Sequence, residues 1–227
     1  MQHIRPYQLF ALLDEPPARR VVNATIPYRR GAGSLTLLEL FVALAASRIV
    51  GAKRIFEFGT FLGATTFNLA LNLPADGEIF TLDLGATDAR GLAQDGADAP
   101  LTRTHLSSTS CLDFLGSSIS GKVKILTGNS TKFDFSRWTS TIDMAFIDGG
   151  HDLATVRSDT ENSMRLVPKE RLSCVLWHDY RNPAYDELTR YLDELSNQLE
   201  IAHIEDTMLC VWFNDSSGKL MPRLLKR

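Results

Sequence analysis

The chain has 227 residues, of which 44% are hydrophobic and 22% are charged, a composition typical of soluble globular proteins. Its length suits a single domain with a large buried core. The 24 basic and 27 acidic side chains give a net charge of −3. A nucleic-acid-binding protein would carry a basic surface, so this charge argues against nucleic acid as a partner.

The sequence predicts neither a membrane segment nor a secretion signal. The longest apolar run, residues 35–50, is interrupted by charged side chains such as Glu39 and Arg48, which a membrane span rarely tolerates. The N-terminal residues lack the apolar core of a signal peptide. The three cysteines are widely spaced and odd in number, which indicates neither a disulfide framework nor a zinc cluster. We therefore expect a reduced, cytoplasmic protein that contacts no membrane.

Strands alternate with helical patterns along most of the chain, which predicts a parallel sheet with helices on both faces. Residues 1–33 precede the first strand and are expected to act as a lid or as a homodimer contact. Residues 85–100, rich in Gly, Ala and Asp, are expected to form a surface loop that is either mobile or a lid over a ligand. Five strands of the parallel type are predicted at residues 54–58, 78–83, 123–127, 142–148 and 173–177.

The C-terminal part of the chain predicts a helix followed by a hairpin. After Pro183, apolar residues spaced by three and four indicate an amphipathic helix. Two further runs, residues 199–204 and 208–213, are separated by only three residues, which permits an antiparallel hairpin but no parallel crossover. The whole pattern predicts an α/β fold with a seven-stranded mixed sheet, formed by residues 34–227 as one domain.

A glycine-containing segment, residues 57–63, joins the first predicted strand to a helix. Gly59 and Gly63 allow the backbone to turn sharply and allow a ligand to approach the main chain. Asp83 ends the next strand, where a carboxylate can accept hydrogen bonds from both hydroxyls of a ribose. These residues together predict a nucleoside-binding site at the carboxyl edge of the sheet.

Two residues of this segment argue against a dinucleotide. Phe61 stands where the dinucleotide motif has its second glycine, and its side chain would obstruct the pyrophosphate. Glu57 places a carboxylate beside the glycines, which disfavours an anionic ligand and favours a cationic one. S-adenosyl-L-methionine (SAM) fits both conditions, because it carries an ammonium and a sulfonium group and has no phosphate.

The pattern Glu57-x-Gly59-x-x-x-Gly63 followed by Asp83 resembles the first two motifs of class I SAM-dependent methyltransferases. The resemblance covers about residues 35–213 and implies their Rossmann-like fold, with strand order 3-2-1-4-5-7-6. An acidic residue is common where this chain has Asn129, so the adenine contact departs from the family pattern. The cofactor-binding set that the resemblance implies is Glu57, Gly59, Thr60, Phe61, Gly63, Asp83, Asn129, Ser130 and Asp148.

A second group of polar residues follows the fourth and fifth strands. Asp148 and His151 come after one strand, and His178 and Asp179 come after the next. Neighbouring parallel strands end at the same edge, so we expect these side chains to converge. Carboxylates there can hold Mg²⁺, which would lower the pKa of a coordinated hydroxyl, and His151 can accept its proton.

This region resembles the catechol and caffeoyl-coenzyme A O-methyltransferase group, and more closely the related bacterial families with an I-D-G-x-H strand end. His151 lies three residues after Asp148, where the catechol group has a lysine base. The metal ligands implied by the resemblance are Asp148, Asp179 and His178. The usual Asp-Asn pair after the fifth strand is absent, which leaves a metal-assisted site and a metal-free site both open.

The resemblance implies O-methylation of a small-molecule hydroxyl, with SAM as methyl donor and His151 and Asp148 as catalytic residues. Three other interpretations stay open at this point. The same site could methylate nitrogen, or the chain could be a SAM-fold binding module without catalysis. A dinucleotide oxidoreductase is disfavoured by Glu57 and Phe61.

Overall fold

The computed structural model describes residues 1–13, 21–25, 33–89, 98–108, 110, 112 and 116–225. The part of the predicted loop at residues 90–97 and most of the predicted N-terminal segment after residue 13 lie outside these residues. The strands are β1 (Gln2–Ile4), β2 (Arg54–Phe58), β3 (Glu78–Asp83), β4 (Val123–Thr127), β5 (Met144–Ile147), β6 (Ser173–Trp177), β7 (Ala202–Ile204) and β8 (Cys210–Asn214).

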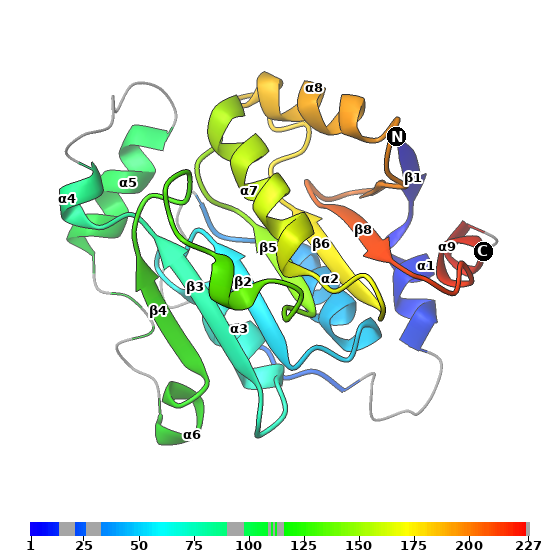
Figure 1. The fold of residues 1–227 in the computed structure, drawn as a ribbon, viewed down its shortest axis with the longest axis horizontal. Helices are drawn as coiled ribbons and strands as arrows, with labels where there is room; N and C mark the ends of the chain where they lie inside the picture. Colours follow the sequence, from blue (N-terminus) through cyan, green and yellow to red (C-terminus); the bar gives the residue numbers. More distant parts are fainter. Residues whose placement is uncertain are drawn as a thin grey trace.

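The helices and the two 3₁₀ turns connect these strands and cover the sheet (Figure 1). They are α1 (Pro6–Phe10), η1 (Ala11–Leu13), α2 (Leu37–Ile49), α3 (Ala64–Asn72), α4 (Ala86–Ala89), α5 (Asp98–Ser107), α6 (Ser117–Ser120), η4 (Ser136–Trp138), α7 (Leu153–Leu166), α8 (Asp186–Leu195) and α9 (Leu220–Leu225). The expectation of a surface loop over residues 85–100 is therefore wrong in part, because α4 lies within it and α5 begins at its end.

The strands form one sheet in the order β1-β7-β8-β6-β5-β2-β3-β4. Strands β2 to β6 are all parallel to one another, and β8 is antiparallel to both β6 and β7. Without β1, this is the predicted order 3-2-1-4-5-7-6. The predicted count of seven strands is wrong, because Gln2–Ile4 adds an eighth strand in parallel register with Ala202–Ile204. A strand of three residues is too short to show an alternating pattern in the sequence.

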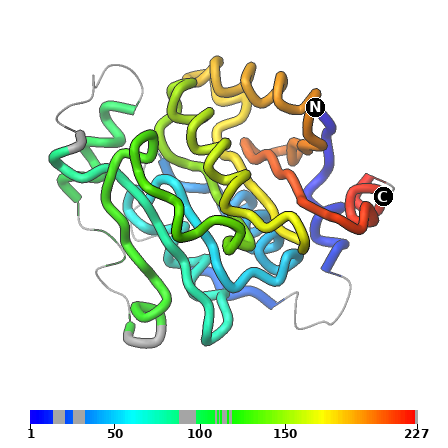
Figure 2. The backbone as a smooth tube through the Cα atoms, viewed as in Figure 1, coloured from blue at the N-terminus to red at the C-terminus, as the bar shows by residue number. Residues whose placement is uncertain are grey.

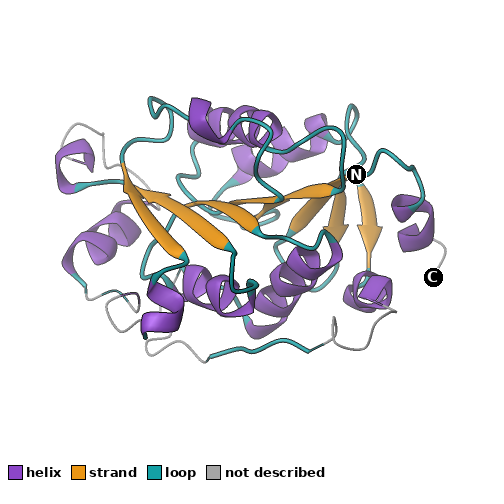
Figure 3. Ribbon diagram, turned by 60° about the horizontal axis from the view of Figure 1, so that its bottom comes forward, coloured by secondary structure: helices purple, strands orange, loops and turns teal. Residues whose placement is uncertain are grey.

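Helices lie on both faces of the sheet (Figure 3). Side chains of the central strands alternate between two hydrophobic clusters. In β5, Met144 and Phe146 join the cluster that includes α2 and α3, whereas Ala145 and Ile147 join the one that includes α7 and α8. Burial on both faces explains why these strands are continuous apolar runs.

The N-terminal residues belong to the body of the molecule. Ile4, Leu9 and Leu13 are buried in the same cluster as α2, and both termini lie on the β1 side of the molecule (Figure 2). The role of the N-terminal segment as a lid or dimer contact stays a prediction. Among the described residues, no helix is both long and apolar enough to cross a bilayer.

Candidate active site

The two predicted sites lie at the carboxyl edge of the parallel strands. Phe58 of β2 is paired with Leu82 of β3 on one side and with Ile147 of β5 on the other. The chain leaves the sheet just beyond these residues, so the glycine segment, Asp83 and Asp148 start side by side. The strand order reverses between β2 and β5, and open α/β sheets bind ligands at such a switch point.

Both glycines of the segment that follows β2 are required by the fold itself. Gly59 has φ +94°, and a Cβ atom there would collide with the carbonyl oxygen of Asp148. Gly63 has φ +78° and precedes α3, where a Cβ atom would collide with the side chain of Leu112. Gly59 therefore lets the ends of β2 and β5 approach each other, and Gly63 leaves room for Leu112, in addition to any role toward a ligand.

Asp83 holds the turn of the glycine segment in place. Its Oδ2 atom accepts hydrogen bonds from the backbone N–H groups of Thr60, at 2.9 Å, and Phe61, at 2.7 Å. Nδ1 of His105, in α5, lies 2.7 Å from the carbonyl oxygen of Phe61. The Oδ1 atom of Asp83 accepts a hydrogen bond of 2.7 Å from the backbone N–H of Leu84. A carboxylate offers about four acceptor positions, so Asp83 keeps capacity for one ligand hydroxyl, on Oδ1.

Glu57 is fully buried behind the glycine segment. Its Oε2 atom accepts hydrogen bonds from the hydroxyl groups of Thr66 and Thr81, while Oε1 has no partner among the described residues. Burial raises the pKa of Glu57 to about 8, against the lowering effect of the two hydroxyls, and the nearby carboxylates of Asp148 and Asp83 add to the rise. Glu57 is therefore protonated near pH 7, which removes the charge that the sequence argument assigned to it.

The predicted adenine-contacting residues follow β4. The Oδ1 atom of Asn129 accepts hydrogen bonds from the backbone N–H and the hydroxyl of Thr131, so this side chain forms a local turn. Ser130 is half-buried in the same turn. Their amide and hydroxyl groups lie at the same sheet edge as Asp83, because Asp83 is paired with Thr127.

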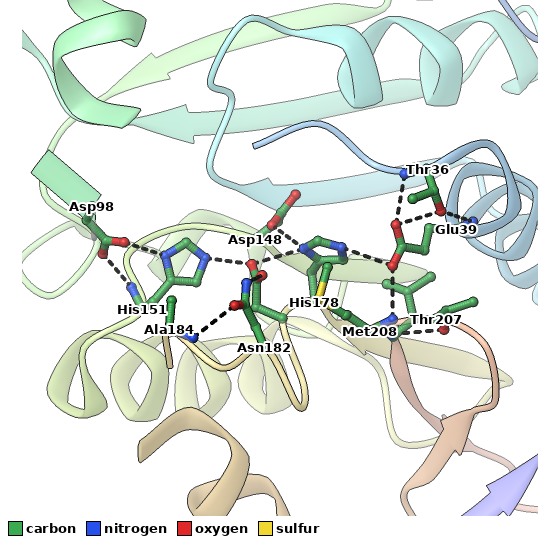
Figure 4. Close-up of polar contacts among 12 residues, drawn as sticks. Thr36, Glu39, Asp98, Asp148, His151, His178, Asn182, Ala184, Thr207 and Met208 are labelled. Carbon is green, nitrogen blue, oxygen red and sulfur yellow. Dashed lines mark hydrogen bonds and ion pairs between the residues drawn. The ribbon is translucent and has the colours of Figure 1, made fainter. Parts of the chain in front are cut away.

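The second site is a chain of alternating carboxylates and imidazoles (Figure 4). His178 Nδ1 lies 3.1 Å from Asp148 Oδ1 and 3.0 Å from Asp179 Oδ2. The same Asp179 oxygen lies 2.8 Å from His151 Nε2. The structure therefore brings together all four residues that the sequence analysis selected after β5 and β6.

The charges of Asp179, His151 and His178 support one another, whereas burial raises the pKa of Asp148 against the lowering effect of His178. Burial alone would raise the pKa of Asp179, but its hydrogen bonds to the two histidines hold it far below its usual range. Burial alone would lower the pKa of His151, but Asp179 and Asp98 raise it to about 10. The pKa of His178 is also raised well above its ordinary value by Asp148, Asp179 and Glu39, against the effect of burial. The neighbouring carboxylates therefore favour the protonated form of both rings.

Sequence reasoning missed several residues that hold this group. Asp98, the first residue of α5, contacts His151 twice: Oδ1 lies 2.8 Å from Nδ1, and Oδ2 accepts a hydrogen bond of 2.9 Å from the backbone N–H. The ring of Tyr185 stacks on the His151 ring at 4.0 Å between centroids. Asn182 donates to Asp179 Oδ1 at 2.5 Å. A pocket of about 340 Å³ is lined by Asp98, His151, Asp152, Pro183, Ala184, Tyr185, Asp186 and Glu187.

Three residues of the carboxylate–imidazole chain could hold a metal ion. Asp148, His178 and Asp179 each offer one ligand atom, and these atoms lie within 4.8 Å of one another. Two carboxylate oxygens and one imidazole nitrogen suit a divalent first-row transition metal better than Mg²⁺, which prefers oxygen ligands only. The catechol group has an asparagine directly after its aspartate. In this chain Asn182 lies three residues after Asp179, donates a hydrogen bond to it, and is not one of the three candidate ligands.

Comparison with known proteins identifies the family. A family model described as a methyltransferase domain matches residues 56–180, which is more than half of the chain. An O-methyltransferase from Bacillus cereus in complex with S-adenosylhomocysteine (SAH) is 14% identical, with a TM-score of 0.52 over 91% of this chain and 90% of that one. An SAH-bound methyltransferase from Podospora anserina is 13% identical, with a TM-score of 0.53 over 93% and 89%. The chain therefore belongs to the methyltransferase-domain family and has the fold of the class I SAM-dependent methyltransferases.

Proposed function

We propose that the protein transfers a methyl group from SAM to a hydroxyl group of a small molecule. The observation that carries this proposal is the convergence of Asp148, His151, His178 and Asp179 beside the glycine segment, at the switch point of a methyltransferase fold. The SAH complex of the Bacillus cereus O-methyltransferase, which shares this fold, supports both the cofactor and the class of reaction.

In this proposal the cofactor lies along the edge formed by β2, β3, β4 and β5. The glycine segment faces the methionine part, Asp83 accepts hydrogen bonds from the ribose, and the turn after β4 contacts the adenine. The proposed cofactor-binding residues are Glu57, Gly59, Thr60, Phe61, Gly63, Asp83, Asn129, Ser130 and Asp148.

His151 is the proposed base. Both of its ring nitrogens contact carboxylates in the structure, which favour its protonated form. His151 can therefore accept a proton only after Nε2 has lost its own proton to solvent and has exchanged Asp179 for the substrate hydroxyl. The oxygen then attacks the methyl carbon in line with the sulfur, the carbon–sulfur bond breaks, and its electron pair stays on the sulfur of SAH. The hydroxyl proton stays on His151. Positioning supplies much of the rate, because the sulfonium is already an activated leaving group.

Asp148, His178 and Asp179 are the residues that would hold a divalent cation in this reaction. The cation would lower the pKa of a coordinated hydroxyl and orient it. The alternating arrangement of carboxylates around His178 fits this role, since two carboxylate oxygens already converge on one ring nitrogen. Asp148 would then be a metal ligand that lies between the bound cofactor and the substrate.

A second candidate function is a SAM-binding module without catalysis. It is favoured by one observation, the engagement of both His151 ring nitrogens by carboxylates. His151→Ala separates the two candidates. Catalysis predicts that SAH binding is kept and methyl transfer is lost, whereas a binding module shows no methyl transfer in either protein.

The experiment that tests the cofactor is a calorimetric titration of SAH into EDTA-treated protein. We expect a dissociation constant in the micromolar range, equivalent to about −8 kcal/mol. Release of SAH from SAM, measured against a panel of phenols, sugars and hydroxy acids, then tests methyl transfer. Folded protein that takes up no SAH would contradict the proposed function.

A further inference from the structure

Glu39 lies on the far side of His178 from Asp148 (Figure 4). It belongs to the first turn of α2 and is 2% exposed. Its Oε1 atom lies 3.4 Å from His178 Nε2. The other ring nitrogen, Nδ1, is the one that faces Asp148 and Asp179. His178 is therefore held between one carboxylate at Nε2 and two carboxylates at Nδ1.

The position of Glu39 is fixed from two directions. Its Oε2 atom accepts hydrogen bonds of 2.8 Å from both the backbone N–H and the hydroxyl of Thr36, the residue directly before α2. Its Oε1 atom accepts a hydrogen bond of 2.9 Å from the backbone N–H of Met208, in the turn before β8. Both oxygens of this buried side chain thus act as hydrogen-bond acceptors, as a carboxylate does.

The start of helix α2 uses only one of the two carboxylate oxygens of Glu39. The reciprocal bonds between Thr36 and Glu39 form a capping box, and this role uses Oε2. A glutamine could also fill it. The other oxygen points to the edge of the imidazole ring, where a negative charge favours a proton on Nε2.

A histidine that binds a metal through one ring nitrogen usually donates the N–H of the other to a carboxylate, which fixes the tautomer and the orientation of the ring. We propose that Glu39 is a positioning residue that keeps the proton of His178 on Nε2 and so directs Nδ1 to a divalent transition-metal ion held with Asp148 and Asp179. This inference rests on the metal site in the proposed function. It adds a residue from α2 to a site otherwise built from the segments after β5 and β6.

The test is a calorimetric titration of Mn²⁺ into the full chain, without SAM or substrate. We expect Glu39→Gln to weaken Mn²⁺ binding by about 10- to 100-fold, because the amide group no longer supplies the charge at Nε2. Glu78→Gln is the matched control, since it makes the same change at the opposite edge of the sheet, where Glu78 pairs with Arg54, and it should leave Mn²⁺ binding unchanged. Asp179→Asn removes a proposed ligand and should abolish binding.

A second measurement needs no variant. Histidine side-chain NMR of the wild-type chain with Zn²⁺ reports which nitrogen of His178 carries the proton and which one binds the metal. The inference predicts a proton on Nε2 and zinc on Nδ1. Zinc on Nε2, or Mn²⁺ binding by Glu39→Gln that equals the wild type, would overturn it.

SAH binding, measured on the same proteins, separates this inference from the proposed function. Wild-type protein that binds SAH but neither Mn²⁺ nor Zn²⁺ would overturn the role of Glu39 and leave the methyltransferase proposal standing. Protein that binds the metals with the expected dependence on Glu39 but takes up no SAH would support the metal site and contradict the methyltransferase.

Discussion

The glycine-segment side of the site and the histidine-aspartate side each bury a carboxyl group, but in opposite charge states. Among the described residues, the groups that donate hydrogen bonds to Glu57 are the neutral hydroxyls of Thr66 and Thr81, and its pKa is raised to about 8. Asp179 meets the rings of His151 and His178, and its pKa is held far below its usual range. Both carboxyls are removed from water, so burial alone does not decide their charge.

The comparison shows that the partners decide the charge of a buried acid. A hydroxyl hydrogen bond offsets only part of the cost of burying a charge, whereas two imidazolium ions offset it fully. One edge of the sheet can thus hold a neutral region next to a region of paired charges. Three substitutions each disrupt the neutral region or the charge-paired region.

Loss of the charge on Asp179 should have the largest effect on folding. Asp179→Asn leaves two buried imidazoles without the carboxylate that they share, and removal of one partner from a buried ionic group costs about 4 kcal/mol of unfolding free energy. Urea unfolding at pH 6 with EDTA measures this loss. Asp76→Asn is the control, because Asp76 pairs with Lys53 on the exposed surface and should contribute almost nothing. Equal stability of the two variants would contradict the charge-paired region.

Glu57→Gln should change how stability depends on pH. In the unfolded chain the Glu57 carboxyl ionises near the ordinary glutamate pKa of 4.5, whereas in the folded chain it stays protonated up to about pH 8. The wild type therefore loses stability as pH rises through this window. Between pH 5.5 and 7.5 the variant should gain about 3 kcal/mol relative to the wild type. Urea unfolding at both pH values measures the difference, and parallel curves would show that Glu57 is ionised.

The smallest effect is expected from a single hydroxyl group in the neutral region. Thr81→Val keeps the shape of the side chain and removes one of the two hydrogen bonds that Glu57 Oε2 accepts. The expected loss is about 1 kcal/mol of unfolding free energy. A loss as large as that of Asp179→Asn would mean that Glu57 carries a charge and depends on this hydroxyl to support it.

Much of the fold could be predicted from the sequence because its signals are local. Central strands such as Ser173–Trp177 are apolar on both faces, and the short connector before Cys210–Asn214 permits only a hairpin. The strand Gln2–Ile4 could not be predicted, because its pairing with Ala202–Ile204 has no signature within three residues. The start of α5 at Asp98 was hidden in a segment whose composition is typical of a loop.

The site residues that end strands were predicted for the same reason, since the ends of parallel strands meet. The residues that hold them were not. Asp98 lies 53 positions before His151 in the chain, and no local sequence pattern indicates a contact between residues so far apart. The spacing Thr36-x-x-Glu39 does indicate the start of a helix, but it does not show that one oxygen faces His178.

The pairing of β1 with β7 also has a consequence for the order in which the protein can be assembled during translation. The two strands are 200 residues apart in the chain, and at about 5–20 residues per second the ribosome takes about 10 to 40 seconds to pass from one to the other. Throughout that interval Ile4, which is buried in the finished protein, lacks the strand with which β1 pairs. Strand β1 can therefore pair with its neighbour only after strands β2 to β6 have been made, which makes this pairing a late step of assembly.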